Sequence, residues 1–195
     1  MRKAIIGNGG HAREVIAHLN TDVTIFVTDN HYNILDKKVK PLSTFDPSIY
    51  EIMICIGDPK IREQIFKTLP KETKFFSYVH PTSIILDKNI KIEDGTFIGP
   101  FCVLTTNINI GKQSILLRNV SIGHDCVIGD YFTSMSNTTI SGDVILGQRN
   151  YFGNNSSIRE KLTITDDVIV GMNACVVKDI NESGTYVGVP VKKIK

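Results

Sequence analysis

The fold of this chain is decided by the stretch LLRNVSIGHDCVIG, residues 116–129, in which a large aliphatic residue stands at every sixth position. The same spacing runs without insertion or deletion from Leu86 to Val176, and Ser134 is its one break. A period of six fits neither a helix nor the two-residue alternation of an ordinary strand. The repeat consists of Leu86, Ile92, Ile98, Leu104, Ile110, Leu116, Ile122, Ile128, Ser134, Ile140, Leu146, Phe152, Ile158, Ile164, Val170 and Val176.

Glycine often follows the aliphatic residue of the repeat. We interpret these places as corners where the backbone adopts positive φ or crowds its neighbour, with Asn or Asp as the next best residue. Three hexads then close one triangular coil, and the inward side chains of about five successive coils stack into a continuous core. The expected corner residues are Gly99, Gly111, Gly123, Gly129, Gly147, Gly153 and Gly171, with Asn109, Asp125, Asp143 and Asp166.

These hexads, of the form Ile-Gly-x-x-small-x, resemble those of the hexapeptide-repeat acyltransferases. That family ends its repeats with a Gly-x-Pro-Ala-Lys segment, and here Gly188 begins the similar sequence GVPVKK, in which Val191 replaces the small residue. The resemblance implies a left-handed parallel β-helix.

The sequence before the repeats alternates short apolar runs with helical patterns. We expect strands over Lys3–Ile6, Val23–Val27, Ile52–Ile56 and Lys74–Val79, and helices after the first and third of them. Residues 37–47 are polar and interrupted by proline, so they should form a loop with at most a short strand. The order predicts an α/β, Rossmann-like βαβ domain with a parallel sheet.

A glycine-rich loop, Gly7-Asn-Gly-Gly-His11, joins the first strand to the first helix. It satisfies the pattern Gly-x-Gly-x-x-Ala. Asp29 follows about twenty residues later, where a dinucleotide-binding fold has the acidic residue that binds the ribose. Only about eighty residues precede the repeats, so a mononucleotide half-site fits better than a complete dinucleotide fold. Gly9 and Gly10 would let a phosphate approach the helix N-terminus. The alternative is that the glycines only make a tight turn.

We therefore expect a nucleotide-sugar-binding domain over residues 1–80, a β-helix over 81–180 and a C-terminal tail over 181–195. The 195 residues carry a net charge of +2, which gives no indication of nucleic-acid binding. The apolar run at the start stops at Gly7, too short for a signal peptide or membrane span, so we expect a cytoplasmic protein. The four cysteines lie far apart and should be buried free thiols.

One of the five histidines, His124, lies inside the repeats proper, and Asp125 and Cys126 follow it. Because Ile122 and Ile128 face inward, His124 should lie at a corner with its side chain outward. The sequence His-Asp-Cys-Val-Ile-Gly resembles the His-(Glu/Asp)-Cys-x-Ile-Gly signature of sugar acyltransferases. Together with the Gly-x-Gly-Gly-His opening, it indicates the branch that contains sialic acid O-acetyltransferases and N-acetyltransferases of nucleotide-linked 4-amino-4,6-dideoxy sugars.

The resemblance implies direct transfer from acetyl-CoA, without a metal, in a homotrimer whose active sites lie between subunits. His124 would be the general base, Asp125 would hold its ring, and a glycine-corner N–H would stabilise the thioester oxygen. Coenzyme A would contact Gly142, Asn154, Met172, Gly188 and Lys192. The nucleotide-linked amino sugar, UDP- or GDP-linked, would contact Gly9, Gly10, His11, Asp29, Gly57 and Asp58, with Arg62 near them.

Two positions depart from the family. Many relatives carry a second histidine where this chain has Thr133 and an asparagine where it has Leu117. The sequence therefore leaves open which residues contact the acceptor sugar, and Asn119 nearby could substitute for the missing asparagine.

Other readings are an O-acetyltransferase of sialic acid, a metal-dependent hydratase, which needs three histidines at a subunit interface, and a non-catalytic nucleotide-binding scaffold. A dehydrogenase would rest on the glycine loop alone. A Cys126 nucleophile is disfavoured by its inward position.

Overall fold

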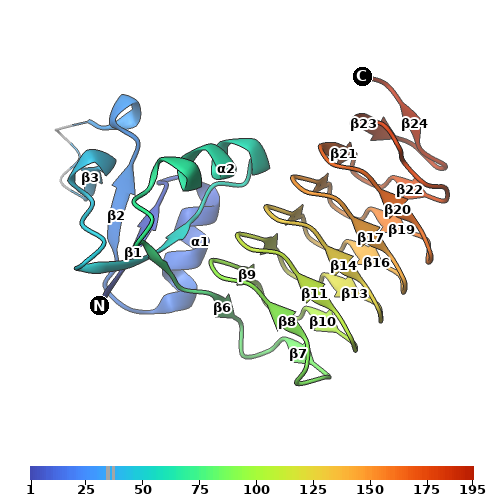
Figure 1. Ribbon diagram of the computed structural model, residues 1–195, viewed down its shortest axis with the longest axis horizontal. Helices are drawn as coiled ribbons and strands as arrows, with labels where there is room; N and C mark the ends of the chain where they lie inside the picture. Colours follow the sequence, from blue (N-terminus) through green and yellow to red (C-terminus); the bar gives the residue numbers. More distant parts are fainter. Residues whose placement is uncertain (34–35, 37) are drawn as a thin grey trace. The chain divides into compact units, whose positions relative to one another are not determined.

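The computed structural model describes residues 1–33, 36 and 38–195 (Figure 1). Its residues form two compact units, Met1–Ser77 and Tyr78–Lys195. The first contains both α-helices of the described chain, and the second is built from short parallel strands. The predicted class, a Rossmann-like α/β domain followed by a left-handed parallel β-helix, is confirmed.

The first unit is a five-stranded parallel sheet in the order β3-β2-β1-β4-β5. Its core contains the side chains of Ala4, Ile6, Phe26, Ile52 and Ile54, each at most 1% exposed. The elements are β1 (Arg2–Ile6), α1 (Gly10–Leu19), β2 (Thr24–Val27), the 3₁₀ turn η1 (Asp29–His31), β3 (Val39–Pro41), the 3₁₀ turn η2 (Leu42–Thr44), β4 (Tyr50–Ile54), α2 (Pro59–Thr68) and β5 (Lys74–Phe75).

Two expectations for this unit change in detail. The strand predicted over Lys74–Val79 is divided, because β5 pairs with β4 whereas Tyr78–Val79 pairs with a strand of the β-helix. The loop expected over residues 37–47 contains the short edge strand β3 and the turn η2, and Lys37 lies outside the described residues.

The second unit winds through three parallel sheets, and its strands are labelled along the coils in Figure 1. The strands are β6 (Tyr78–Val79), β7 (Ile84–Ile85), β8 (Lys91–Ile92), β9 (Phe97–Ile98), β10 (Val103–Leu104), β11 (Asn109–Ile110), β12 (Ile115–Leu116), β13 (Ser121–Ile122), β14 (Val127–Ile128), β15 (Thr133–Ser134), β16 (Thr139–Ile140), β17 (Ile145–Leu146), β18 (Tyr151–Phe152), β19 (Ser157–Ile158), β20 (Thr163–Ile164), β21 (Val168–Val170), β22 (Cys175–Val176), β23 (Gly184–Val187) and β24 (Lys192–Lys193). Strand β23 extends one sheet in parallel, and β24 returns antiparallel to it.

The corners have a left-handed residue at every sixth position, but these residues are not the glycines. Positive φ occurs at Phe101 and then at every sixth residue to Asn173, with Asp125 and Asp143 in the series at +60°. Positive φ is therefore confirmed for those two aspartates and is wrong for Asn109 and Asp166, while the seven glycines meet the other half of the prediction. These glycines are required by crowding instead: a Cβ on Gly123 would lie 2.6 Å from the backbone nitrogen of Gly142 in the next coil.

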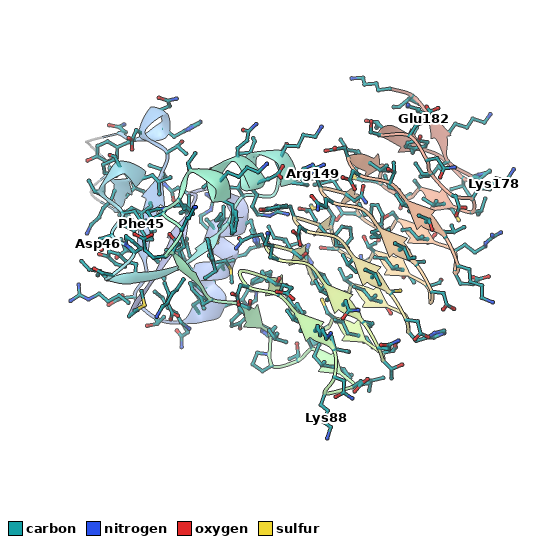
Figure 2. The ribbon with its side chains drawn as sticks, in the orientation of Figure 1. Phe45, Asp46, Lys88, Arg149, Lys178 and Glu182 are labelled. Carbon is teal, nitrogen blue, oxygen red and sulfur yellow. The ribbon has the colours of Figure 1, made fainter. Side chains whose placement is uncertain are left out.

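Polar ladders join equivalent corners of successive coils. Asn119 donates its side-chain amide to Asn137 (3.1 Å), which donates to Asn155 (3.0 Å). At another corner, marked in Figure 2 by the label of Arg149, this residue donates to both carboxylate oxygens of Asp167 at 3.0 Å. Each bond spans 18 residues, which is one coil.

The repeat is in register except at its start. From Ile98 to Val176 each hexad residue is at most 2% exposed, whereas Leu86 is 63% exposed. Leu104 pairs with Ile85 while Ile110 pairs with Ile92, so one extra residue lies between β7 and β8. The inward residue of the first coil is therefore Ile85, and the assignment of Leu86 to the core is wrong.

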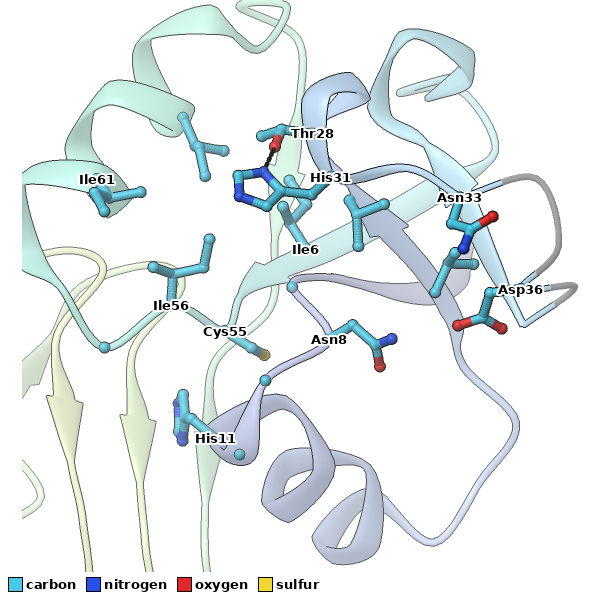
Figure 3. A pocket seen from close by; sticks show the side chains of 17 residues that line it. Ile6, Asn8, His11, Thr28, His31, Asn33, Asp36, Cys55, Ile56 and Ile61 are labelled. Carbon is cyan, nitrogen blue, oxygen red and sulfur yellow. Dashed lines mark hydrogen bonds between the residues drawn. The ribbon is translucent and has the colours of Figure 1, made fainter.

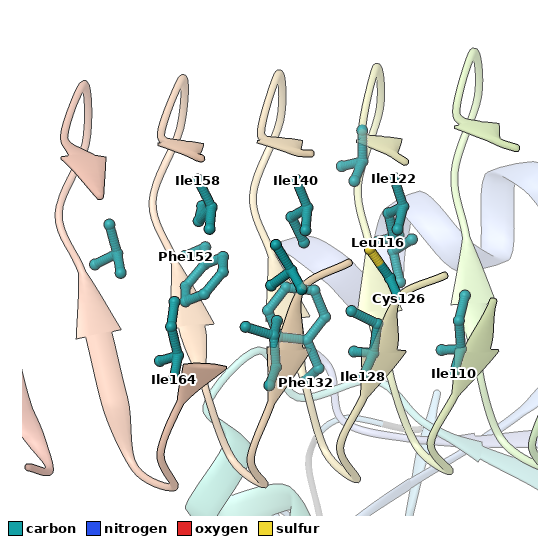
Figure 4. Close-up of a cluster of buried hydrophobic side chains, with 14 of the residues drawn as sticks. Ile110, Leu116, Ile122, Cys126, Ile128, Phe132, Ile140, Phe152, Ile158 and Ile164 are labelled. Atoms are coloured by element: carbon teal, nitrogen blue, oxygen red, sulfur yellow. The ribbon is translucent and has the colours of Figure 1, made fainter. Parts of the chain in front are cut away.

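The break at Ser134 is explained by a second inward position, four residues after each hexad residue. In the neighbouring hexads that position holds the smaller residues Cys126 and Thr138, but here it holds Phe132 (Figure 4). The Phe132 ring packs edge-on against Phe152, with centroids 5.1 Å apart. Ser134 pairs with Phe152 in the same sheet, so its small side chain leaves room for both rings.

We predict that Ser134→Leu, which restores the hexad pattern, lowers the free energy of unfolding by about 1–3 kcal/mol through overpacking. Urea unfolding measures this loss. Phe132→Val combined with Ser134→Leu should be more stable than Ser134→Leu alone. A Ser134→Leu variant as stable as the wild type, or a double variant no more stable than Ser134→Leu, would contradict the explanation that Phe132 fills the space a leucine at position 134 would need.

Candidate active site

His124 lies at a corner of the β-helix between β13 and β14. Ile122 and Ile128 are buried on either side of it, while the His124 side chain is 58% exposed. Asp125, next in the chain, is the left-handed corner residue. The corner therefore turns the imidazole outward, as expected from the sequence.

The imidazole is held on one side by a carboxylate. His124 Nδ1 lies 2.7 Å from Asp125 Oδ2, and Asp125 Oδ1 accepts a hydrogen bond from Asn107 Nδ2 at 2.6 Å. The hydrogen bond from Asn107, and then that from His124, lowers the pKa of Asp125, so this side chain is an acceptor at neutral pH. Because a carboxylate only accepts, Nδ1 is the protonated nitrogen of the neutral ring, and Nε2 can take a proton.

The other face of the ring lies against Gly142, one coil further along the chain. A Cβ at Gly142 would lie 2.6 Å from both Cε1 and Nε2 of His124, so any side chain there would displace the ring. In the described part of the chain, no hydrogen bond uses the backbone N–H of Gly142. The residue therefore offers a backbone donor close to the nitrogen that can act as a base.

The other residues expected to contact coenzyme A lie at a different corner. Asn154 is two hexads after Gly142, so it occupies another edge of the triangular coil. Met172 stacks one coil beyond Asn154, with its sulfur 3.9 Å from Asn154 Nδ2, and is 69% exposed. Gly188 and Lys192 are exposed and lie in the hairpin of β23 and β24. A single chain therefore does not bring His124 and Asn154 to one corner.

The first unit contains a cavity of about 490 Å³ at the glycine loop (Figure 3). Gly9, Gly10 and His11 line it at the N-terminus of α1, and Gly57 lines it beyond the end of β4. The carboxyl ends of two neighbouring parallel strands are the usual place for a ligand in such a sheet. Its apolar walls come from Val27, Val39, Ile56 and Ile61.

Two acidic residues expected at this cavity do not line it. Asp29 accepts a hydrogen bond from the backbone of Ser43 at 3.1 Å. Asp58 is the N-cap of α2 and accepts from the backbone nitrogens of Lys60 and Ile61. The structure thus gives both carboxylates local structural partners.

His11 and Arg62 lie close to the glycine loop. Burial, followed by the charges of Arg62 and His18, lowers the pKa of His11 to about 4, so its ring is neutral at physiological pH. Arg62 is fully buried and donates to the carbonyl of Ile56 at 2.6 Å and that of Gly57 at 3.2 Å. It thereby fixes the backbone that follows β4.

Sequence reasoning missed several residues of these sites. Asn107 was detectable, because it stands 18 residues, one coil, before Asp125. Thr28, His31, Asn33 and Asp36 also line the cavity. Their sequence gave no signal, because the packing of the sheet brings them to the glycine loop.

Cys126 is buried and its thiol donates to the carbonyl of Ser141 at 3.1 Å. Burial raises its pKa, so it is poorly suited to act as a nucleophile. Among the described residues, one set of potential metal ligands groups His124 with Asp125 and Asp143, which differs from the three histidines of a hydratase site. In the same described ranges, no helix has the length and apolar character needed to span a bilayer.

Known proteins similar to this chain share its two-part organisation. Residues 3–69 match the PglD N-terminal domain family. GDP-perosamine N-acetyltransferase of Escherichia coli O157:H7 is 27% identical over 174 residues, covering 80% of this chain and 77% of the relative.

Two solved structures cover the whole chain. WeeI from Acinetobacter baumannii AYE superposes with a TM-score of 0.89 at 25% identity over 100% of both chains. PerB from Caulobacter crescentus, solved in complex with CoA and GDP-perosamine, superposes with a TM-score of 0.88 at 22% identity, over 100% of this chain and 98% of PerB. In sequence and in fold the chain is thus similar to the hexapeptide-repeat sugar acyltransferases, of the type that includes nucleotide-4-amino-sugar N-acetyltransferases.

Proposed function

We propose that this protein transfers the acetyl group of acetyl-CoA to the amino group of a UDP- or GDP-linked 4-amino-4,6-dideoxy sugar, in glycan or polysaccharide biosynthesis. The observation that carries the proposal is the corner in which Asp125 holds His124 Nδ1 at 2.7 Å while the other face of the ring lies against Gly142. The GDP-perosamine N-acetyltransferase relative supports the choice of acceptor.

In this mechanism His124 Nε2 removes a proton from the amine as nitrogen bonds to the thioester carbonyl carbon. Asp125 stabilises the imidazolium that forms, and its own hydrogen bond from Asn107 keeps it oriented. Negative charge grows on the carbonyl oxygen, and the Gly142 N–H is the proposed donor to it. The carbon–sulfur bond then breaks, and the sulfur of CoA takes the proton from His124.

We assign binding of the nucleotide to residues 1–80 and acyl transfer to 81–180, with contacts to coenzyme A shared between 81–180 and the tail over 181–195. The cavity at Gly9, Gly10 and His11 supports the first assignment, because it lies at the N-terminus of α1, where the helix dipole and backbone N–H groups favour a diphosphate. An O-acetyltransferase of sialic acid would use the same base, but a free sialic acid carries no diphosphate for this loop.

We propose that the protein acts as a homotrimer, in which coenzyme A lies between His124 of one subunit and Asn154 of its neighbour. The different corners of these residues within one chain support this arrangement. Val127 and Ile145, on adjacent strands of one face, are 43% and 50% exposed, as expected for residues that a neighbouring subunit covers.

All four cysteines are free, which fits the reducing cytoplasm.

The test is release of free CoA from acetyl-CoA with a panel of UDP- and GDP-linked 4-amino sugars and free sialic acid. We expect turnover with one nucleotide amino sugar, and loss of about 10²–10⁴-fold in kcat for His124→Ala. The variant should keep the thermal stability and oligomeric state of the wild type, because the ring is exposed. Turnover on sialic acid alone would select O-acetylation, and undiminished turnover in His124→Ala would reject His124 as the base.

Gly142→Ala should lower kcat by about 100-fold, because its Cβ would push the His124 ring by roughly 1 Å or more. The matched control is the same change in a His124→Ala background, where the added methyl has no ring to displace and should cost no further activity. If Gly142→Ala lowers activity equally in both backgrounds, or leaves the wild-type rate unchanged, then contact with the His124 ring is not the reason why position 142 must be glycine.

A further inference from the structure

A second carboxylate lies beside the candidate base. Asp143 follows Gly142 directly and is the left-handed corner residue one coil after Asp125, with φ of +60°. Its backbone nitrogen donates to the carbonyl of His124 at 2.8 Å. A carboxylate oxygen of Asp143, a ring nitrogen of His124 and a carboxylate oxygen of Asp125 all lie within 4.8 Å of one another.

The two carboxylates differ in what they bind. Asp125 uses one oxygen for His124 Nδ1 and the other for Asn107. The Asp143 side chain is exposed, and in the described part of the chain it takes no hydrogen bond and no ion pair. Asp125 therefore serves the imidazole, whereas Asp143 has a negative charge available to a molecule that reaches His124.

The turn itself does not require this charge. The equivalent corner residue one coil before Asp125 is Asn107, and one coil after Asp143 it is Lys161. Asparagine adopts the left-handed conformation at least as readily as aspartate. A neutral side chain would thus satisfy the backbone at position 143, and the carboxylate needs another explanation.

We propose that Asp143 is a specificity-determining residue that selects an amine over a hydroxyl acceptor by pairing with the acceptor's ammonium form. This inference rests on the proposed N-acetyltransferase function and names the feature of the acceptor that the site recognises. At neutral pH an aliphatic amine is largely protonated, so it carries a positive charge that a sugar hydroxyl lacks. A carboxylate beside the base therefore favours the amine at the place where it reacts.

The proton balance agrees with this role. The bound ammonium group loses one proton to solvent, and the neutral nitrogen then bonds to the carbonyl carbon of the thioester. At that stage the nitrogen again carries positive charge, which the Asp143 carboxylate stabilises. His124 takes the second proton and passes it to the sulfur of CoA as the carbon–sulfur bond breaks. The Asp143 carboxylate takes part in neither proton transfer.

The test compares wild type with Asp143→Asn on two ligands: the nucleotide-linked 4-amino-4,6-dideoxy sugar that the wild type acetylates, and its counterpart with a hydroxyl at position 4. Calorimetric affinities are measured without acetyl-CoA, so no turnover occurs. We expect the preference of the wild type for the amino ligand to fall about tenfold in Asp143→Asn. Affinity for the hydroxyl ligand and KM for acetyl-CoA should stay unchanged, and kcat/KM for the amino sugar should fall by a similar factor.

Glu160→Gln is the matched control, because it removes an exposed carboxylate at the same corner one coil beyond Gly142. It should leave the preference for the amine intact. An unchanged preference in Asp143→Asn, with the wild type still acetylating the amino sugar, would overturn the role of Asp143 and leave the proposed function standing. An equal effect of Glu160→Gln would overturn it too, because the negative electrostatic potential of the whole corner, and not Asp143 in particular, would then account for the preference for the amine. Failure of the wild type to acetylate any nucleotide amino sugar would overturn both.

Discussion

Every coil of the β-helix depends on one constraint: the backbone must turn through a left-handed conformation at each corner. Residues from Phe101 to Asn173 meet it at every sixth position, although the conformation is unfavourable for most side chains. Ladders such as Asn119–Asn137–Asn155 offset part of this strain by joining the corners of successive coils. With the corners fixed, the aliphatic residues between them stack into a continuous core.

The candidate active site uses the same constraint. Asp125 is a corner residue, and the conformation that turns the chain also brings its carboxylate to His124. Asn107, at the same corner one coil earlier, supports that carboxylate. Gly142, one coil after His124, lets the backbone approach the ring. Contacts between residues 18 positions apart therefore bring the proposed base, its orienting carboxylate and the proposed backbone donor together within the coils.

The repeat predicted the core because hexad spacing depends only on local backbone geometry, and the outward position of His124 followed from the inward-facing Ile122 and Ile128 on either side of it. Leu86 was misplaced because an extra residue between β7 and β8 leaves no mark in an unbroken six-residue spacing. The glycines were correctly expected to crowd a neighbour, but the pattern did not separate them from the positive-φ residues that lie two positions later in the chain. Asn33 and Asp36, which line the cavity at the glycine loop, were not predicted because tertiary packing, with no local motif, brings them there.

His124 and Asn154, which is expected to contact coenzyme A, lie at different corners of one chain, so the proposed trimer would build each active site from two chains. Complementation tests this most directly: His124→Ala chains are mixed with chains carrying Asn154→Arg and Met172→Arg, and acetyl transfer is measured. In randomly mixed trimers, one site in each hybrid would keep both intact partners, so activity should return to about a quarter of the wild-type rate. No recovery in hybrids of confirmed mixed composition would contradict an active site shared between subunits.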